Sequence, residues 1–455
     1  MTFREAIKEN DGLKLLVENL SLNTSLGREK LMKTQFSIDK KWISQQFANT
    51  NCVLEYLKNH KNQQYFYTEL DNLLSATADI TKIVNLLKTK NTLDDISLFE
   101  VKSFALNCKK IHALIQDISC ISLQLPNLGY VISLLDPEGL ETYQFYVFSA
   151  YDKTLAELRK DLDDSVEYTE KYNLCLEIES RIRTELSNDL CRYVNQLEIA
   201  MDIIAELDLN FAKARLYLNW NLKQPEIIQD ENRLEFHSLI YPPLSEKLKE
   251  KGKYFQPIDI VLQDKPVLLT GANMAGKTIL LKSLAFAQFC FQFGFFVAAE
   301  NAKMCLMEGI LISIGDNQNE EEGLSSFAAE ILNVNTFIKL AKTGKRYLIL
   351  VDELARTTNP YEGKELVRGF INVLATLNSV SLITTHYTVE NTDAKRLRVK
   401  GFSNKNILPP ITISDIAENM DYSLIEDDNF KVPTEAIHLA QLLAIDEDWL
   451  TQIHK

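Results

Sequence analysis

The chain is short of the features that mark secreted, membrane-spanning and disulfide-framed proteins. Its seven cysteines are an odd number without close pairing, which argues against a disulfide framework or a zinc site and indicates a reducing cytoplasm. No apolar run reaches the roughly 18 to 20 residues of a membrane span. The N-terminal stretch MTFREAIKENDG lacks the apolar core of a secretion signal. The sequence therefore predicts a cytoplasmic protein with no membrane partner.

The chain also has fewer positively than negatively charged residues. Lysine and arginine number 49 against 63 aspartates and glutamates, which gives a net charge of −14. A protein that mainly grips duplex DNA usually displays a basic surface, because phosphate contacts supply most of its affinity. The acidity therefore disfavours DNA as the main partner without forbidding a local basic patch. One basic cluster, KRLRVK at 395–400, is interpreted as a solvated loop, with phosphate contact as the alternative.

Glycine and proline are scarce in the first half. Residues 1–222 hold four glycines and two prolines, whereas the rest of the chain holds eleven and nine. Few helix breakers over such a length indicate long helices, and apolar residues repeat there at helical spacing. The longest stripe comprises Ile182, Leu186, Leu190, Val194, Leu197, Met201, Ile204 and Leu207. We predict an all-helical domain over 1–222, and the pattern fits both a projecting arm over 140–207 and a compact bundle.

After residue 222 the pattern changes to alternating strands and helices. Short β-rich runs, PVLLT, RYLILVDE and SVSLITTH, are separated by helix-like stretches. Such alternation is typical of a parallel sheet with crossover helices. We predict an α/β domain over 223–455, so that the fold class is α plus α/β with the helical domain first.

The octapeptide GANMAGKT at 271–278 lies between the apolar run VLLT and an apolar, helix-like stretch. It meets the full P-loop pattern in the strand–loop–helix context that the pattern requires. Glycines let backbone N–H groups curl around phosphate oxygens, and the helix N-terminus favours negative charge. Lys277 is predicted to reach the β- and γ-phosphates, and Thr278 to ligate Mg²⁺. The predicted nucleotide-binding residues are Gly271, Ala272, Asn273, Met274, Ala275, Gly276, Lys277 and Thr278.

Two further strands are predicted to end in polar residues. YLILVDE delivers Asp352 and Glu353 at a carboxyl end, where α/β folds bind their ligands. Asp352 is predicted to hold Mg²⁺, and Glu353 to orient or deprotonate the attacking water. His386 follows SLITT and is predicted to sense the γ-phosphate or to position the water, with a satisfied core histidine as the alternative. With Lys277, these residues predict an ATP hydrolase that uses ATP and Mg²⁺.

These segments resemble the ATPase domain of the MutS family, which is related to the ABC ATPases. The P-loop interior Asn273-Met274, GLSSFAAEI at 323–331, LVDELARTTNPYEG at 350–363 and TTHY at 384–387 are similar to that family's phosphate loop, signature, acidic segment and switch histidine. The resemblance implies an ABC-type P-loop ATPase domain that follows a helical core and lever domain.

The same resemblance implies further roles. Phe255, in YFQPIDIVL, is expected to stack on adenine. The protein is expected to work as a homodimer or as a heterodimer with a MutS-like paralogue. In such a dimer the signature residue Ser325 acts in trans on the γ-phosphate bound opposite, and closure of the dimer moves helical arms.

The chain also departs from the family pattern. Ala272 replaces a proline of the phosphate loop, and Thr357 replaces a glycine after the acidic segment. The core-like stretch LNTSLGREKL starts at residue 22, which leaves no room before it for a mismatch-reading domain. DELARTTNPYEG with ENMDYSL and VPTEAIHLAQLLAID is similar to a MutS-like branch linked to cobalamin-dependent lysine and ornithine aminomutases. The preferred client is therefore an aminomutase that the protein reactivates, and the alternative is a DNA-structure-binding, mismatch-repair-related ATPase.

Overall fold

The computed structural model describes residues 1–59, 63–116, 124–160, 168–229, 231–271, 275–314, 326–402, 418–427, 440–444, 446, 449 and 452. The chain forms two compact units, each discontinuous in sequence. We call Met1–Asn19, Gln35–Phe47 and Leu216–Lys455 the sheet unit, and Leu20–Thr34 and Ala48–Arg215 the helical unit. No described helix combines enough length with enough apolar character to traverse a lipid bilayer.

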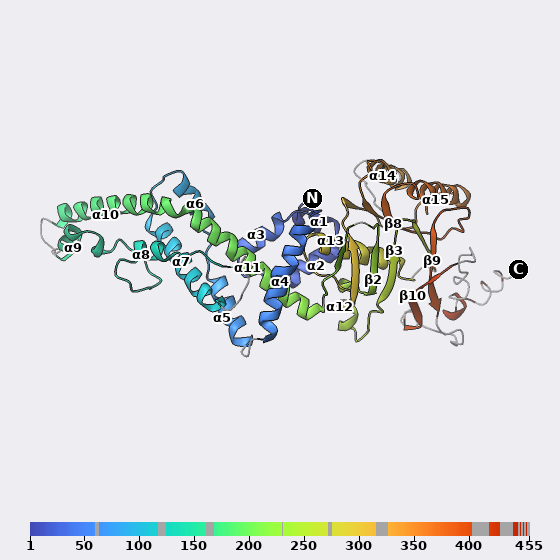
Figure 1. The fold of residues 1–455 in the computed structure, drawn as a ribbon, viewed down its shortest axis with the longest axis horizontal. Coiled ribbons are helices and arrows are strands. Elements are labelled where there is room, and N and C mark those ends of the chain that lie inside the picture. Colours follow the sequence, from blue (N-terminus) through green and yellow to red (C-terminus); the bar gives the residue numbers. More distant parts are fainter. Residues whose placement is uncertain are drawn as a thin grey trace. The chain divides into compact units, whose positions relative to one another are not determined.

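The helical unit, over its described residues, consists of helices and their connections (Figure 1). Its elements are α3 (Ser25–Lys33), α4 (Lys40–Asn59, which starts in the sheet unit), α5 (Gln63–Ser75), α6 (Thr81–Lys88), α7 (Asp95–Ile115), α8 (Gly129–Leu135), η2 (Ser149–Tyr151), α9 (Lys153–Lys160), α10 (Tyr168–Leu190), η3 (Cys191–Tyr193) and α11 (Val194–Trp220, which ends in the sheet unit).

The predicted apolar stripe lies on α10 and α11. Ile182, Leu186 and Leu190 are buried on α10, and the stripe continues with buried residues on α11 after the short turn η3. The helical interpretation of this stretch is confirmed. Cys52 takes part in a disulfide bond, whereas the described residues Cys108, Cys175, Cys191, Cys290 and Cys305 are free cysteines.

The sheet unit carries all the described strands. Its helices are α1 (Phe3–Glu9), α2 (Asp11–Asn19), α12 (Pro242–Glu250), α13 (Lys277–Gln292), α14 (Ser326–Ala341) and α15 (Pro360–Leu374). Its strands are β1 (Glu226–Ile228), β2 (Leu234–Leu239), β3 (Ile258–Leu262), β4 (Val267–Thr270), β5 (Asn301–Cys305), β6 (Gly309–Ser313), β7 (Tyr347–Val351), β8 (Ser379–Thr384), β9 (Lys395–Phe402) and β10 (Met420–Glu426).

The strands form two sheets. One has four strands in the order β1-β5-β2-β3, and the other has six in the order β10-β9-β4-β8-β7-β6. In the second sheet β9, β4, β8, β7 and β6 are parallel, and β10 is antiparallel to β9. Because β4, β8 and β7 are parallel neighbours, the segments that follow them emerge side by side at one edge. The predicted parallel sheet is thus present, and the chain is a mixture of helix and sheet as expected.

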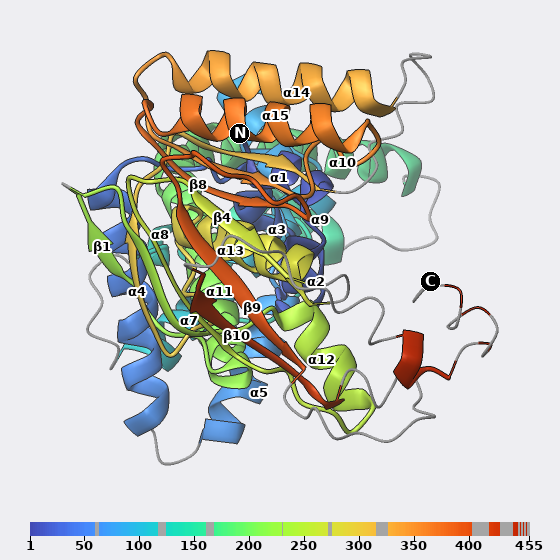
Figure 2. The same cartoon turned by 90° about the vertical axis from the view of Figure 1, so that its right-hand side faces the viewer.

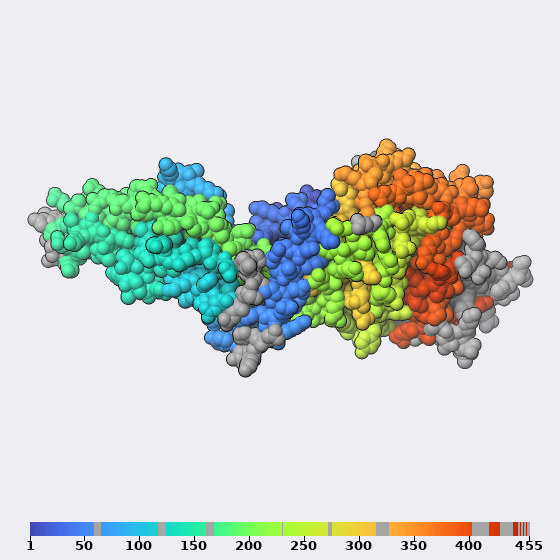
Figure 3. Space-filling view, viewed as in Figure 1, coloured from blue at the N-terminus to red at the C-terminus, as the bar shows by residue number. Residues whose placement is uncertain are grey.

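Helices cover both faces of the six-stranded sheet. Alternate β7 residues, Tyr347, Ile349 and Val351, pack with α14 and α15 in one apolar core. In Figure 2 these two helices lie above the sheet, whereas α13 runs beneath β4 on the other face. The orange outer surface of the sheet unit in Figure 3 is formed by the α14 and α15 region. β7, β8 and β4 are buried along their whole length, as expected for parallel strands covered on both faces.

The end of α13 lies in an aromatic cluster. Phe293 stands 4.9 Å from Phe3, and Phe289 stands 6.0 Å from Phe36, measured between ring centroids. The N-terminal segments 1–19 and 35–47 therefore pack within the sheet unit. The sequence-based division at residue 222 assigned them to the helical domain, and that division stays a prediction about functional domains.

The basic cluster 395–400 is not a loop. It forms most of β9, which pairs with β4 on one side and β10 on the other. Lys395 pairs with Glu426 at 2.9 Å and Lys400 with Asp421 at 2.7 Å, both acids lying on β10. The loop interpretation was wrong because Leu397 and Val399 alternate with the charges and are buried, which is a strand pattern with period two.

Candidate functional site

The loop between β4 and α13 has a glycine with positive φ at each of its described ends. Gly271 and Gly276 have φ angles of 152° and 74°, which favour glycine. A Cβ added at Gly276 would lie 3.1 Å from the Tyr422 ring. The absence of a side chain at Gly276 therefore lets this ring lie close to the backbone of the loop. Lys277 begins α13, is 5% exposed, and its Nζ donates to the Gly271 carbonyl at 2.7 Å. The predicted ligands Ala272, Asn273 and Met274 lie outside the described residues.

Three oxygen-bearing side chains meet where β7 and β8 end beside α13. The Thr278 hydroxyl donates to Asp352 Oδ2 at 2.5 Å, and the Thr384 hydroxyl donates to Asp352 Oδ1 at 2.5 Å. Thr384 also accepts from the backbone N–H of Glu353 at 2.9 Å. The structure therefore brings the two predicted metal-ligating residues, Thr278 and Asp352, together. Thr384 was missed by the sequence reasoning, although its place at the end of a buried strand before His386 was the available signal.

Glu353 stands beside the P-loop lysine. Its Oε1 lies 3.4 Å from Lys277 Nζ, and its Oε2 lies 3.5 Å from Arg356 Nη1. The residue has a φ of 48°, a left-handed conformation that is uncommon for a residue with a side chain. The turn thus brings the carboxylate of Glu353 to the lysine at the start of α13.

His386 follows β8 and lies in the electrostatic field of the same site. Burial lowers its pKa below 6.5, the charge of Glu353 opposes that shift, and Lys277 and Arg356 add to it. The imidazole is therefore neutral at neutral pH, with one ring nitrogen able to donate and the other to accept. Its ring lies 4.2 Å from that of Tyr387.

The predicted adenine-stacking residue lies on the segment before β3. Phe255 is half-buried, and its neighbour Gln256 bonds twice to β10. Gln256 Nε2 donates to Asp421 Oδ1 at 2.9 Å, and the N–H of Tyr422 donates to Gln256 Oε1 at 3.0 Å. Hydrogen bonds from Lys400, Ser423 and Gln256 lower the pKa of Asp421, so it is a stable charged anchor. Phe255 is therefore held next to the strand whose Tyr422 contacts Gly276.

The signature segment is described only from Ser326 onward. The predicted trans-acting residue Ser325 lies outside the described residues. Within α14, the Glu330 carboxylate accepts from the backbone N–H of Ala355, at 3.2 Å to Oε2 and 3.4 Å to Oε1. The signature helix thus contacts the loop that carries Glu353, a connection that the sequence pattern did not predict.

The oxygens at this site fit a magnesium ion that is held jointly with phosphate. Mg²⁺ prefers hard oxygen ligands and usually takes only one or two from the protein, with phosphate and water supplying the rest. Thr278 and Asp352 provide one hydroxyl and one carboxylate within hydrogen-bond distance of each other. The described residues contain no group of three or more His, Cys, Asp or Glu side chains that could hold a metal by themselves.

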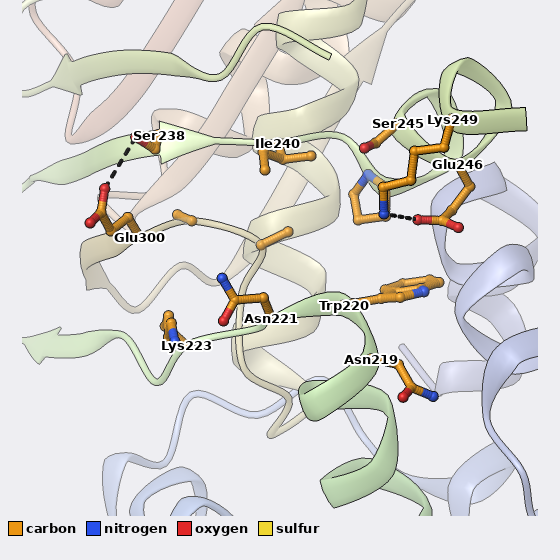
Figure 4. Close-up of a pocket in the computed structure, with 13 residues that line it drawn as sticks. Asn219, Trp220, Asn221, Lys223, Ser238, Ile240, Ser245, Glu246, Lys249 and Glu300 are labelled. Carbon is orange, nitrogen blue, oxygen red and sulfur yellow. Dashed lines mark hydrogen bonds and ion pairs between the residues drawn. The ribbon is translucent and has the colours of Figure 1, made fainter. Parts of the chain in front are cut away.

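A separate concavity of about 450 Å³ lies between the end of α11, the end of β2 and the start of α12 (Figure 4). Its charges balance, because Lys249 pairs with Glu246 at 2.7 Å and Lys223 faces a lining that also contains Glu300. It contains none of the P-loop residues. A balanced lining gives no reason to select phosphate, so the strand-end site remains the candidate for nucleotide.

Comparisons with known proteins lead to the same part of the chain. Residues 267–410, which include β4, Asp352, Glu353 and His386, match the family model of MutS domain V. This stretch of the chain is therefore similar to domain V of the MutS family. It is 33% identical over 211 residues to the endonuclease MutS2 of Ruminiclostridium cellulolyticum, which covers 46% of this chain and 26% of that protein. The endonuclease MutS2 of Agathobacter rectalis is 32% identical over 211 residues, which again cover 46% of this chain and 26% of that protein.

The match to these MutS proteins is partial. That of Leuconostoc mesenteroides is 30% identical over 212 residues, or 25% of its length, so the matched stretch spans about a quarter of each curated relative. Proteins of the MutS family are in general ATPases that use Mg²⁺. The similarity to MutS2 proteins supports the DNA-related alternative for the client and gives no support to the aminomutase branch.

Proposed function

We propose that this protein is a MutS-type ATP hydrolase that works as a dimer and acts on DNA structure. The observation that carries the ATPase assignment is the convergence of Lys277, Thr278, Asp352 and Glu353 where the start of α13 meets the end of β7. The DNA assignment rests on the similarity to endonuclease MutS2 proteins. The net charge of −14 argues in the opposite direction.

In this proposal each residue has a distinct task. The loop N–H groups and Lys277 hold the phosphates of ATP. Thr278 and Asp352 would hold Mg²⁺, which would supply positive charge beside the phosphates. Glu353 accepts the proton of the attacking water, and the neutral imidazole of His386 orients that water or the γ-phosphate. Phe255 stacks on the adenine, and Ser325 completes the site of the partner subunit.

The first test replaces the proposed base. Glu353→Gln keeps the size of the side chain and removes its basicity, so we expect nucleotide binding to persist while kcat falls by about 10²–10⁴. Glu365→Gln, which makes the same change on α15 where Glu365 pairs with Arg368, is the matched control and should leave kcat unchanged. Normal hydrolysis by Glu353→Gln would show that the catalytic assignment is wrong.

The client is tested by stimulation of hydrolysis. We expect homoduplex, mismatched or branched DNA to raise the ATPase rate, and the stimulation to fade with salt because contacts to phosphate release counterions. The overall acidity favours a second candidate, a protein client, and a cobalamin-dependent aminomutase inactivated by turnover serves as its probe. Recovery of that mutase with ATP, together with no response to DNA, would replace the DNA proposal by a reactivating role.

A further inference from the structure

The loop after β7 holds two residues in the left-handed region. Glu353 has a φ of 48° and Ala355 a φ of 61°. Residues with a Cβ are strained in this region, and they persist only where surrounding contacts determine the conformation. The geometry of the proposed base therefore depends on whatever holds Ala355, two residues further along the loop.

Ala355 is held on both of its backbone groups by side chains from other elements. Its N–H donates to the Glu330 carboxylate on α14, and its carbonyl accepts from the Tyr387 hydroxyl at 2.8 Å. Ala355 is 0% exposed and Tyr387 is 7% exposed. Buried polar groups of this kind are costly to leave without partners, so the two side chains act as a clamp on the loop.

The surroundings are shaped to keep the tyrosine hydroxyl in place. A Cβ at Gly363 on α15 would lie 2.6 Å from the Tyr387 hydroxyl oxygen, so the absence of a side chain there makes room for it. Burial raises the pKa of Tyr387, and the negative charges of Glu330 and Glu353 raise it further. The hydroxyl is therefore protonated and able to donate to Ala355.

We propose that Glu330 and Tyr387 are positioning residues that hold the loop of Glu353 in its catalytic geometry. The inference rests on the proposed ATPase function. It makes Tyr387 a link between His386, its chain neighbour, and the loop of Glu353. It makes Glu330 a link between that loop and α14, the helix that directly follows the signature serine. Neither side chain is assigned a contact with nucleotide.

The first experiment removes the tyrosine hydroxyl. In Tyr387→Phe the Ala355 carbonyl loses its donor, and we expect kcat for ATP to fall by about 10- to 100-fold, since small misplacements of a catalytic group cost this much. The Kd for ATP should stay within about two-fold, because Lys277 and the loop glycines are untouched. Tyr347→Phe removes the same oxygen from the same apolar core and should leave both quantities unchanged. Equal losses of kcat in the two variants would overturn the inference.

The second experiment uses rescue by a conservative variant. Glu330→Ala removes both acceptors of the Ala355 N–H and should lower kcat without changing the Kd for ATP. Glu330→Gln retains one amide oxygen as an acceptor and should restore most of kcat. If both variants hydrolyse ATP as the wild type does, the clamp has no role in positioning. If wild-type protein itself hydrolyses no ATP, the proposed function fails instead, so the two failures are distinct.

Discussion

At the scale of single residues, Lys213 is the most deeply buried cation with a perturbed pKa in the described part of the helical unit. It lies on α11 and is 1% exposed. Burial lowers its pKa from 10.5 to about 8, the charge of Glu206 works in the opposite direction, and Lys30 adds to the lowering. Desolvation therefore outweighs the favourable partner, as is common for a buried charge. The protonated form is disfavoured in the folded protein relative to the unfolded chain.

This shift predicts a pH dependence of stability. Between about pH 8 and 10.5 the unfolded chain binds more protons at Lys213 than the folded protein, so this group's contribution to the free energy of unfolding rises with pH. Below pH 8 the cost of the buried charge is present in full. We expect Lys213→Met to be more stable than wild type at pH 7, by at most about 3 kcal/mol. The advantage should shrink towards pH 10.

The measurement is urea unfolding of both proteins at pH 7 and pH 10. Lys88→Met, which removes a half-exposed lysine paired with Glu198, is the matched control and should show no comparable change with pH. An advantage of Lys213→Met that stays constant or grows with pH would contradict the buried-charge explanation.

At the scale of elements, the start of α3 depends on a contact that is remote in sequence. The Asp208 carboxylate on α11 accepts from the N–H of Thr24 at 2.8 Å and from its hydroxyl at 2.7 Å. Thr24 in turn caps α3 by accepting from the Gly27 N–H at 2.8 Å. A Cβ at Gly27 would lie 2.5 Å from Asp208 Oδ2. Glycine is therefore required here by close packing on the carboxylate.

Two glycine substitutions should have opposite effects. Gly27→Ala should destabilise the protein by about 1–3 kcal/mol, because the methyl group displaces Asp208 from the cap of α3. Gly369→Ala, in the interior of α15 where an added Cβ meets nothing within 4 Å, should stabilise it by about 0.5–1 kcal/mol. Urea midpoints of both variants test this, and a stabilising Gly27→Ala would refute the close-packing argument.

Among the elements, local sequence patterns predicted some and failed to predict others. The stripe on α10 and α11 and the apolar runs of β4, β7 and β8 were predictable because their periodicity is local. The strand nature of β9 was hidden by its charges. The pairing of β5 between β1 and β2 is non-local, and no window of sequence contains it. Likewise Lys277, Thr278 and Asp352 followed from known patterns, whereas the hydrogen bonds of Thr384, Tyr387 and Glu330 join segments that are remote in the sequence.

At the scale of the whole molecule, two of the crossings between units lie inside helices. The chain passes from the sheet unit to the helical unit within α4, between Phe47 and Ala48, and returns within α11, between Arg215 and Leu216. A helix transmits displacement along its axis better than a loop does. We therefore expect the proposed movement of the helical unit on ATP turnover to pass through these two helices.

The proposed dimer can be tested by mixing inactive subunits. If each site combines the P-loop of one subunit with Ser325 of the other, Lys277→Ala and Ser325→Ala should each be inactive alone. With random pairing of equal amounts, about half of the dimers are heterodimers. In each heterodimer one of the two sites has both an intact P-loop and an intact signature. The mixture should therefore recover about a quarter of wild-type activity.

A second mixture shows whether the recovery has the proposed cause. Lys277→Ala combined with Glu353→Gln places both defects in residues that serve the site of their own subunit. Each site of that heterodimer lacks either the lysine or the base, and no activity should return. Measuring ATP turnover for both mixtures at equal total protein therefore separates trans completion from simple stabilisation by association. Recovery in both mixtures, or in neither, would contradict the assignment of Ser325 to the partner's site.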